Sequence, residues 1–160
     1  MNILTVLKFP HKYLNETSDN ITEIDYSIIK IINDMKETMY YNEGLGLAAI
    51  QIGVKKNLLI INTSNEEKQI LVIINPKIIY HKKTHTYNEG CLSFPNIFIH
   101  VERKKKIKLK FLSLDKKYKY IKIDNLLSIC IQHEIDHLNG ITLYERASKI
   151  KKNMILRKIK

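Results

Sequence analysis

The segment His133-Glu134-Ile135-Asp136-His137 has the residue types and the spacing of a metal-dependent hydrolase. Histidines four positions apart lie one turn above each other on a helix, about 6 Å along its axis, so both imidazoles can reach one metal ion. The glutamate between them then lies beside the metal, where it can act as a general base. Two ordinary helix histidines without a metal are the alternative.

A catalytic metal site needs a third protein ligand and one open position. Cys130 shares the helix face of the histidines, but it lies seven residues before His137. That separation is about 10.5 Å along a helix axis and leaves little room for a tetrahedral arrangement. A separate segment must supply the ligand. Cys91 in Glu89-Gly90-Cys91-Leu92-Ser93 is the best candidate, because a thiolate binds borderline-soft cations strongly. An inert buried thiol is the alternative for Cys91.

The histidine spacing also occurs in zinc peptidases, but two other positions argue against that class. Leu143 stands where the longer metzincin pattern has its third histidine. Glu145 lies too close to His137 to be the downstream glutamate ligand of other peptidases. A site of one cysteine and two histidines therefore indicates a different kind of hydrolase.

Three helices are predicted to position or flank this site. Apolar residues recur at helical spacing over residues 24–40, with Asp25 as the candidate N-cap. A second amphipathic helix covers residues 125–139, contains the histidine pair and ends before Gly140. A third, basic helix covers residues 148–160.

Four strands are predicted beside these helices. The runs 58–61 and 70–74 are apolar and typical of buried strands, and residues 62–68 form a polar loop between them. Lysines alternate with apolar residues over 106–111, which indicates a strand with one exposed face, and a turn leads into residues 118–123. We therefore expect a single α+β domain with antiparallel or mixed β-sheets packed around a central metal-binding helix.

The composition limits the remaining function classes. The formal net charge is +11, and nearly all of the excess comes from lysine, which favours polyanions without the bidentate readout that specific DNA recognition needs. A compositional bias toward lysine is the alternative explanation. Two cysteines cannot form a disulfide framework, and neither a signal peptide nor a membrane span is indicated. We expect a location in the bacterial cytoplasm or an organelle interior.

Three segments together resemble peptide deformylase of the bacterial type. They are Gly44-Leu45-Gly46-Leu47-Ala48-Ala49 followed by Gln51, then Glu89-Gly90-Cys91-Leu92-Ser93, then Gln132-His133-Glu134-Ile135-Asp136-His137. Their order and separations match the family, and the likeness extends from Val6 to about Ser148. The resemblance implies one catalytic domain over residues 1–160. Its implied reaction removes formyl from the N-terminal formylmethionine of nascent polypeptides and releases formate.

The resemblance also implies the chemistry of the site. One divalent metal ion, Fe(II) in the bacterial enzymes and replaceable by Zn(II) or Ni(II), would be held by Cys91, His133 and His137. Metal-bound hydroxide would attack the formyl carbon, with Glu134 as general base and then general acid. The Gln51 amide and the Leu92 backbone N–H would stabilise the oxyanion. A purely structural amide is the alternative for Gln51.

Substrate recognition is assigned by the same resemblance. The helix positions 126, 129 and 130 continue the metal-binding face as an apolar stripe, which suits an unbranched methionine side chain, although plain helix core is the alternative. Glu89 is expected to pair with Arg103 and brace the cysteine loop. The substrate-binding positions implied are Leu45, Gly46, Glu89, Gly90, Leu126, Ile129 and Cys130.

The basic helix over 148–160 suggests a second partner. Some bacterial deformylases dock on ribosomal RNA through this helix, and a solvated lysine-rich helix is the alternative. Two rival functions remain for the whole chain, a small metallopeptidase and a basic nucleic-acid-binding protein with a structural metal. Neither rival accounts for Gln51 and the glycine-rich motif.

Overall fold

A curved five-stranded sheet, wrapped around one helix, dominates the computed structural model, which describes residues 2–64 and 69–159. The strands are β1 (Gly46–Ala48), β2 (Leu58–Asn62), β3 (Ile70–Cys91), β4 (Phe94–Leu112) and β5 (Tyr118–Asp124). They pair in chain order, and every pairing between them is antiparallel. The predicted α+β class is confirmed, with one antiparallel sheet in place of several antiparallel or mixed ones.

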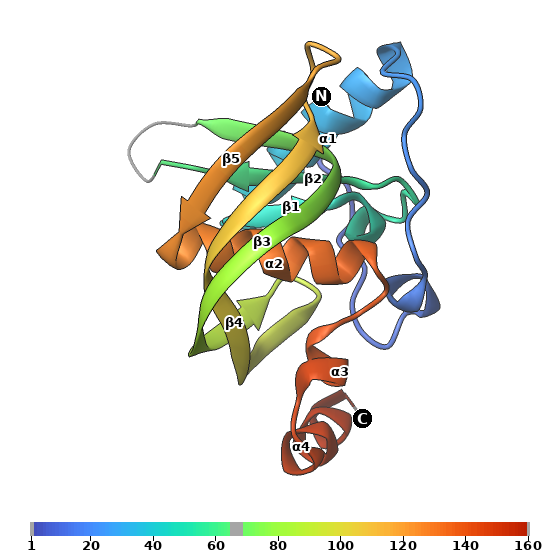
Figure 1. Cartoon of the computed structure of the whole chain (residues 1–160). Helices are drawn as coiled ribbons and strands as arrows, with labels where there is room; N and C mark the ends of the chain where they lie inside the picture. Colours follow the sequence, from blue (N-terminus) through green and yellow to red (C-terminus); the bar gives the residue numbers. More distant parts are fainter. Residues whose placement is uncertain (1, 65–68, 160) are drawn as a thin grey trace.

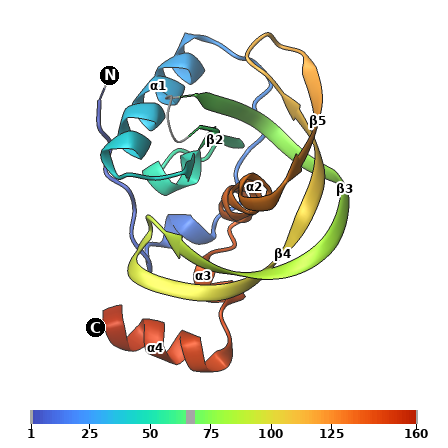
Figure 2. The ribbon, with the colours of Figure 1, turned by 90° about the vertical axis from the view of Figure 1, so that its left-hand side faces the viewer.

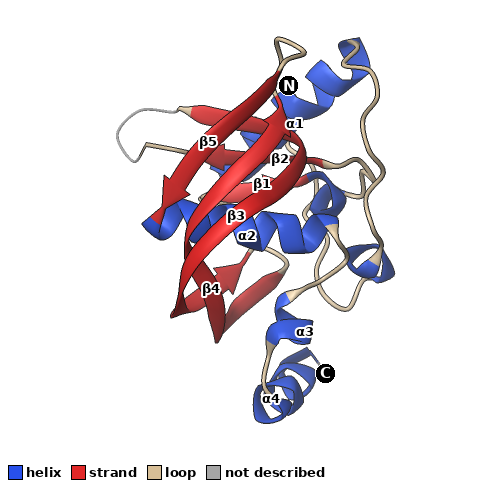
Figure 3. Ribbon diagram, in the orientation of Figure 1, coloured by secondary structure: helices blue, strands red, loops and turns tan. Residues whose placement is uncertain are grey.

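Among the described residues, four α-helices and two short 3-10 helices accompany the sheet (Figure 3). They are η1 (Lys12–Asn15), α1 (Tyr26–Tyr41), η2 (Ala49–Ile52), α2 (Asn125–Leu138), α3 (Leu143–Arg146) and α4 (Lys149–Ile159). In the part of the chain that the structure describes, none of these helices is both long and apolar enough to cross a membrane.

The first predicted helix is confirmed as α1. Asp25 is its N-cap, and its side chain accepts a hydrogen bond of 3.0 Å from the backbone N–H of Ile28. The apolar face of α1, which includes Ile32 and Met35, is buried in a core cluster shared with β1 and β2. This packing holds the short strand β1, and with it the glycine-rich motif, beside the second helix.

Helix α2 carries the histidine pair and lies on the inner side of the curved sheet (Figure 2). It begins and ends close to the predicted boundaries, and Gly140 follows its C-cap with a φ of 71°. A Cβ atom at Gly140 would lie 2.5 Å from the backbone oxygen of Asn15, so a side chain has no room there. Ile131 and Leu138 pack into a core cluster with residues of β2, β3, β4 and β5, which fixes the orientation of the helix.

Strands β3 and β4 are much longer than the sequence pattern predicts. They contain 22 and 19 residues and pair as a hairpin from Ile74↔Leu112 to Cys91↔Phe94. The predicted strand over 70–74 is only the start of β3, and residues 65–68 of the predicted loop lie outside the described residues. The hairpin brings Cys91, at its turn, to the helix that carries the histidines.

The C-terminal part of the chain forms α3 and α4. The sequence pattern did not predict α3, which begins with a capping box in which Thr142 and Glu145 bond each other's backbone groups. The predicted basic helix is confirmed as α4. Its buried residue Ile155 packs in a third core cluster with Phe94 and Ile97 of β4.

Candidate active site

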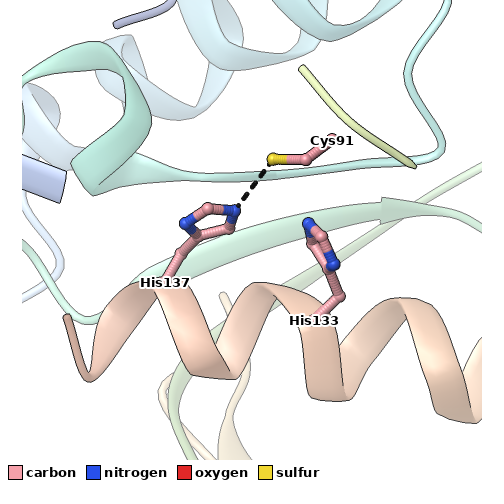
Figure 4. Close-up of side chains that lie close together, drawn as sticks. All are labelled: Cys91, His133 and His137. Atoms are coloured by element: carbon pink, nitrogen blue, oxygen red, sulfur yellow. Dashed lines mark hydrogen bonds between the residues drawn. The ribbon is translucent and has the colours of Figure 1, made fainter. Parts of the chain in front are cut away.

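Three metal-ligand atoms converge where the β3–β4 turn meets α2. They belong to Cys91, His133 and His137, and all lie within 4.8 Å of one another (Figure 4). The sulfur of Cys91 is 3.2 Å from Nε2 of His137. Within residues 2–64 and 69–159 this is the one such group, and Cys130 does not belong to it. The convergence of Cys91 with the two histidines therefore agrees with the ligand set expected from the sequence.

The surroundings of the two imidazoles fit a bound cation. Nδ1 of His133 bonds the carboxylate of Glu89 at 2.9 Å, which leaves Nε2 as the coordinating atom, a common arrangement for metal-binding histidines. Burial, followed by the repulsion of His133, lowers the pKa of His137 well below its ordinary value, so that ring is neutral as a ligand must be. Burial opposes a charge on His133, yet the Cys91 sulfur and Glu89 outweigh it and raise the pKa. The site thus attracts positive charge.

Glu134 lies between the ligands and is 5% exposed. Burial raises the pKa of its carboxyl group to about 7, although His133 opposes the shift. Its Oε2 is buried without a hydrogen-bond partner among the described residues, which is unusual for a carboxylate oxygen and leaves it ready to accept a proton from a small donor. A base with a pKa near the working pH is the kind that hydrolytic sites use.

Gly46 makes room for Glu134. A Cβ atom built on Gly46 would lie 2.7 Å from Oε1 of Glu134 and 2.7 Å from Cδ1 of Ile61. The glycine in β1 therefore lets the carboxylate lie directly against the backbone of the strand. The sequence interpretation gave Gly46 to the substrate alone, and the contact with Glu134 is an additional reason for a glycine there.

Gln51 spans the two sides of the site. Its Oε1 accepts a hydrogen bond of 2.9 Å from the backbone N–H of Ala48, while its Nε2 lies 3.6 Å from the sulfur of Cys91. The same Nε2 donates to Oγ of Ser93 at 3.2 Å. Ser93 is fully buried, and its backbone N–H donates to the Cys91 sulfur at 3.4 Å. The sequence interpretation missed Ser93, although it is the last residue of the cysteine motif.

A buried ionic network supports the ligands from behind. Arg103 of β4 donates two hydrogen bonds to the Glu89 carboxylate, at 2.8 and 3.0 Å, and this pairing was predicted. Arg103 also pairs with Asp136 of α2, and Asp136 in turn binds Arg146 of α3 at 2.6 Å. The second bond of Glu89, to His133, was not predicted, although metal-binding histidines commonly donate to a carboxylate. The network ties the cysteine strand, β4, α2 and α3 into one unit.

One cavity of about 590 Å³ opens beside these residues. Its walls include every residue that the sequence suggested for substrate or catalysis: Leu45, Gly46, Gln51, Glu89, Gly90, Leu92, Leu126, Ile129, Cys130 and Glu134. Cys91 and His133 also line it, whereas His137 lies deeper, at 1% exposure. Burial raises the pKa of Cys130 to about 12, so this thiol stays protonated and serves as an apolar wall.

Lys8, Tyr87 and Phe98 line the same cavity and were not singled out from the sequence. Lys8 donates a hydrogen bond of 2.6 Å from its Nζ to the backbone oxygen of Leu92. It ties the N-terminal segment to the turn that follows Cys91. No motif marks these three residues, because Lys8 comes from a distant segment and Tyr87 and Phe98 lie just outside the two ends of the cysteine motif.

Known proteins share both the sequence and the fold. Residues 3–153 match the sequence profile of the family described as polypeptide deformylase. A peptide deformylase of Bartonella tribocorum is 40% identical over 165 residues, which cover 100% of this chain and 93% of that protein. One of Rhizobium meliloti is 41% identical and covers 99% of this chain and 92% of its own length.

Solved structures agree with these relatives. A crystal structure of a peptide deformylase from Legionella pneumophila superposes with a TM-score of 0.94 at 38% identity, covering 98% of this chain and 93% of the other. One from Ehrlichia chaffeensis, in complex with actinonin, gives 0.94 at 37% identity, with 99% and 96% covered. With its profile, its relatives, its fold and its cysteine–histidine cluster in agreement, the chain belongs to the polypeptide deformylase family.

Proposed function

We propose that this protein removes the formyl group from the N-terminal formylmethionine of nascent polypeptides and releases formate. The observation that carries the proposal is the convergence of Cys91, His133 and His137 with the buried Glu134 at one cavity. Because its substrate arises where proteins are made, we place the enzyme in the bacterial cytoplasm or an organelle interior.

A divalent cation held by Cys91, His133 and His137 would supply Lewis acidity and lower the pKa of water at the site to about 7. One sulfur and two nitrogen ligands suit Fe(II), Zn(II) and Ni(II), and we propose Fe(II) as the native ion. The donor set, the bond from Glu89 to Nδ1 of His133 and the neutral ring of His137 support a divalent cation at this site.

Glu134 acts as the proton carrier of the reaction. Its unpartnered Oε2 takes a proton from the attacking water and returns it to the amine that leaves. A pKa of about 7 lets one carboxyl group perform both steps near neutral pH. Positioned proton transfer of this kind typically contributes about 10²–10⁴ in rate.

Two hydrogen-bond donors are proposed for the developing oxyanion. Nε2 of Gln51 lies beside the ligand sulfur, where the bond from Ala48 to its Oε1 fixes the orientation of the amide. The backbone N–H of Leu92 is the second donor, in the turn that Lys8 braces through the Leu92 carbonyl. Losing one donor of an oxyanion hole commonly costs about 10²–10³ in rate.

The methionine side chain is proposed to lie against the apolar face of α2. Ile129 and Cys130 form the wall, and Leu126 and Leu45 are 58% and 43% exposed at the cavity, where a substrate would cover them. Burying a methionine side chain contributes about 1.5–3 kcal/mol. Glu89 lines the cavity too, but its carboxylate already binds Arg103 and His133, so its proposed contribution is to hold the wall in place.

The test combines metal analysis of anaerobically purified protein with formate release from a formyl-Met peptide. Glu134→Ala should retain the metal and lose about 10²–10⁴ of kcat, whereas Cys91→Ala should lose both metal and activity. Glu102→Ala, which removes an exposed carboxylate from β4, is the matched control. Full turnover by Glu134→Ala would refute the assigned base. Cleavage of internal bonds in casein, without formate release, would favour a peptidase.

A finer proposal concerns the ribosome. Helix α4 exposes Lys149 and the apolar Ile150 and Met154, the last two at 76% and 44% exposure, and we propose that this face docks on ribosomal RNA. Deleting residues 149–160 should weaken ribosome binding and flatten its salt dependence. If neither quantity changed, α4 would be a solvated helix.

A further inference from the structure

We propose that the outer face of β3, β4 and β5 binds single-stranded RNA, with lysines holding phosphates and tyrosine rings stacking on bases. Figure 2 shows α2 on the inner side of this curved sheet, and Figure 1 looks onto the outer side. The face is therefore separate from the catalytic cavity, whose walls include α2.

The strand register gathers the lysines. Residues paired across antiparallel strands point to the same face. Lys108 pairs with Lys122 of β5 on one side and with Tyr80 of β3 on the other. Two residues before Lys108 in the same strand, Lys106 pairs with Lys82 of β3. Neighbours across the sheet are about 4.8 Å apart and alternate residues along a strand about 6.8 Å apart, so the backbone positions of the lysines form a lattice.

A register shift between Ile78 and Tyr80 brings the tyrosine into this lattice. Ile78 pairs with the buried Leu109 and faces the core, whereas Tyr80 pairs with Lys108 on the outer side. With strict alternation Tyr80 would share the face of Ile78, so the extra residue turns its ring outward.

The positive charge of the face is not neutralised locally. Its lysines are Lys77, Lys82, Lys106, Lys108, Lys110 and Lys122. Asp124, which pairs with Lys106, is the carboxylate in these rows, and the exposed Glu102 lies on the same face four residues before Lys106 in β4. Across residues 2–64 and 69–159, no ion pair involves any of the six lysines. A surface of this kind attracts a polyanion by releasing its counterions.

The aromatic rings distinguish RNA from other polyanions. Tyr80, Tyr118 and Tyr120 are 56%, 58% and 56% exposed, and Nζ of Lys110 lies 4.5 Å from the centre of the Tyr118 ring. Exposed rings between cations are the usual platform for unstacked bases. An acidic peptide or an anionic lipid surface would use the lysines but leave the rings without a stacking partner.

A hollow of about 420 Å³ lies on this face, toward the row in which Lys106 pairs with Asp124. It is lined by Tyr80, Lys106, Ile107, Lys108, Lys122, Ile123 and Asp124. With Tyr80 and three lysines against one carboxylate, Asp124, the lining suits a nucleotide, with its base on the tyrosine and its phosphate among the lysines. Lysines give no bidentate readout, so binding should tolerate any sequence. The choice of RNA rests on the proposed function, because nascent chains emerge from the ribosome, which is rich in RNA.

The first experiment measures binding of a fluorescein-labelled 12-nucleotide oligouridylate to the metal-loaded full chain, by anisotropy between 50 and 200 mM KCl. Lys106→Gln/Lys108→Gln/Lys122→Gln should reduce the slope of log K against log salt by about 2, at about 0.7 per phosphate contact. The matched control Lys12→Gln/Lys30→Gln/Lys56→Gln removes the same charge from exposed positions outside the sheet face and should keep the slope. Equal losses in both triple variants, or no binding by the parent chain, would overturn the proposal.

The second experiment tests stacking with Tyr80→Ala. This variant should bind the oligouridylate about 5- to 100-fold more weakly and bind inorganic polyphosphate as the parent does. Unchanged oligouridylate affinity, or an equal loss for polyphosphate, would contradict stacking and with it the assignment to RNA. Formate release is measured on every variant. A chain that binds RNA but releases no formate would refute the proposed enzyme activity and not the RNA face.

Discussion

The residues around Glu134 show how closely the catalytic carboxyl group is enclosed. Its side chain lies against the backbone of Gly46, and in the sequence it comes directly after the ligand His133. Enclosure removes water from the carboxylate, which is the main cause of its raised pKa. The contact between Gly46 and Glu134 thus has two consequences. It requires a glycine at position 46, and it contributes to the raised pKa of Glu134.

Gly46→Ala should therefore lower kcat/KM about 10²-fold, because a Cβ atom 2.7 Å from Oε1 of Glu134 must displace the carboxylate. Gly44→Ala is the matched control. Its Cβ would meet the movable end of Leu92 at 3.0 Å, so the loss should stay below about tenfold. Steady-state formate release from a formyl-Met peptide measures both variants, and a greater loss at Gly44 would contradict this account.

Most of the site could be predicted from the sequence because its residues lie in three short motifs. The spacing of His133 and His137 is informative by itself, since a helix turn is the same in every protein. Ser93 and Lys8 were missed for a physical reason. Ser93 belongs to the cysteine motif, but its residue type does not reveal that its hydroxyl is buried against Gln51. Lys8 belongs to no motif, and only the folded chain brings it to Leu92.

At the scale of elements, Arg103 is the residue that joins the sheet to α2. It is 4% exposed and pairs with two carboxylates, Glu89 and Asp136. Arg103→Met should lower the free energy of unfolding by about 3–5 kcal/mol, because it removes the one buried cation that both carboxylates share and leaves Glu89 with His133 and Asp136 with the partly exposed Arg146. Urea denaturation measures this loss.

Arg146→Met is the matched control for that variant. Arg146 binds the same Asp136, but its side chain is 40% exposed, and such pairs contribute about 0–1 kcal/mol. Equal losses for the two variants would show that burial is not what makes Arg103 important. Arg103→Met should also lose more metal than Arg146→Met, because Glu89, which Arg103 binds, orients the ligand His133.

Elements with a continuous apolar run or one apolar face were predicted, whereas mostly exposed and very short elements were not. Helices α1 and α2 have a periodic apolar face, and β5 pairs with a strand that alternates lysines with apolar residues. The middle of β3, from about residue 79 to 88, is mostly exposed, so it has no apolar alternation to reveal it. Helix α3 has four residues, too few for periodicity, although the Thr142–Glu145 capping box could have indicated it.

At the scale of the whole molecule, the ligands come from two distant parts of the fold, so a bound ion should stabilise all of it. An ion at 1,000 times its Kd adds about 4 kcal/mol to the folded state. Adding Zn(II) or Ni(II) to protein that a chelator has freed of metal should therefore raise Tm by roughly 8–16 °C, a range set by the size of the chain. Differential scanning calorimetry measures the shift. Cys91→Ala should show little of it, and an equal shift there would place the stabilising ion elsewhere.

The separation of Cys91 and His137, 46 residues along the chain, has a consequence for biogenesis. At a translation rate of about 5–20 residues per second, roughly 2–9 seconds pass between the synthesis of the cysteine and that of the last histidine. Through that interval the newly made Cys91 lacks His137, its partner in the folded site, and an unprotected cysteine is open to oxidation. The metal site can therefore form only late in synthesis, after His137 has been made. Until then, oxygen can oxidise Cys91 and inactivate the molecule before it is complete.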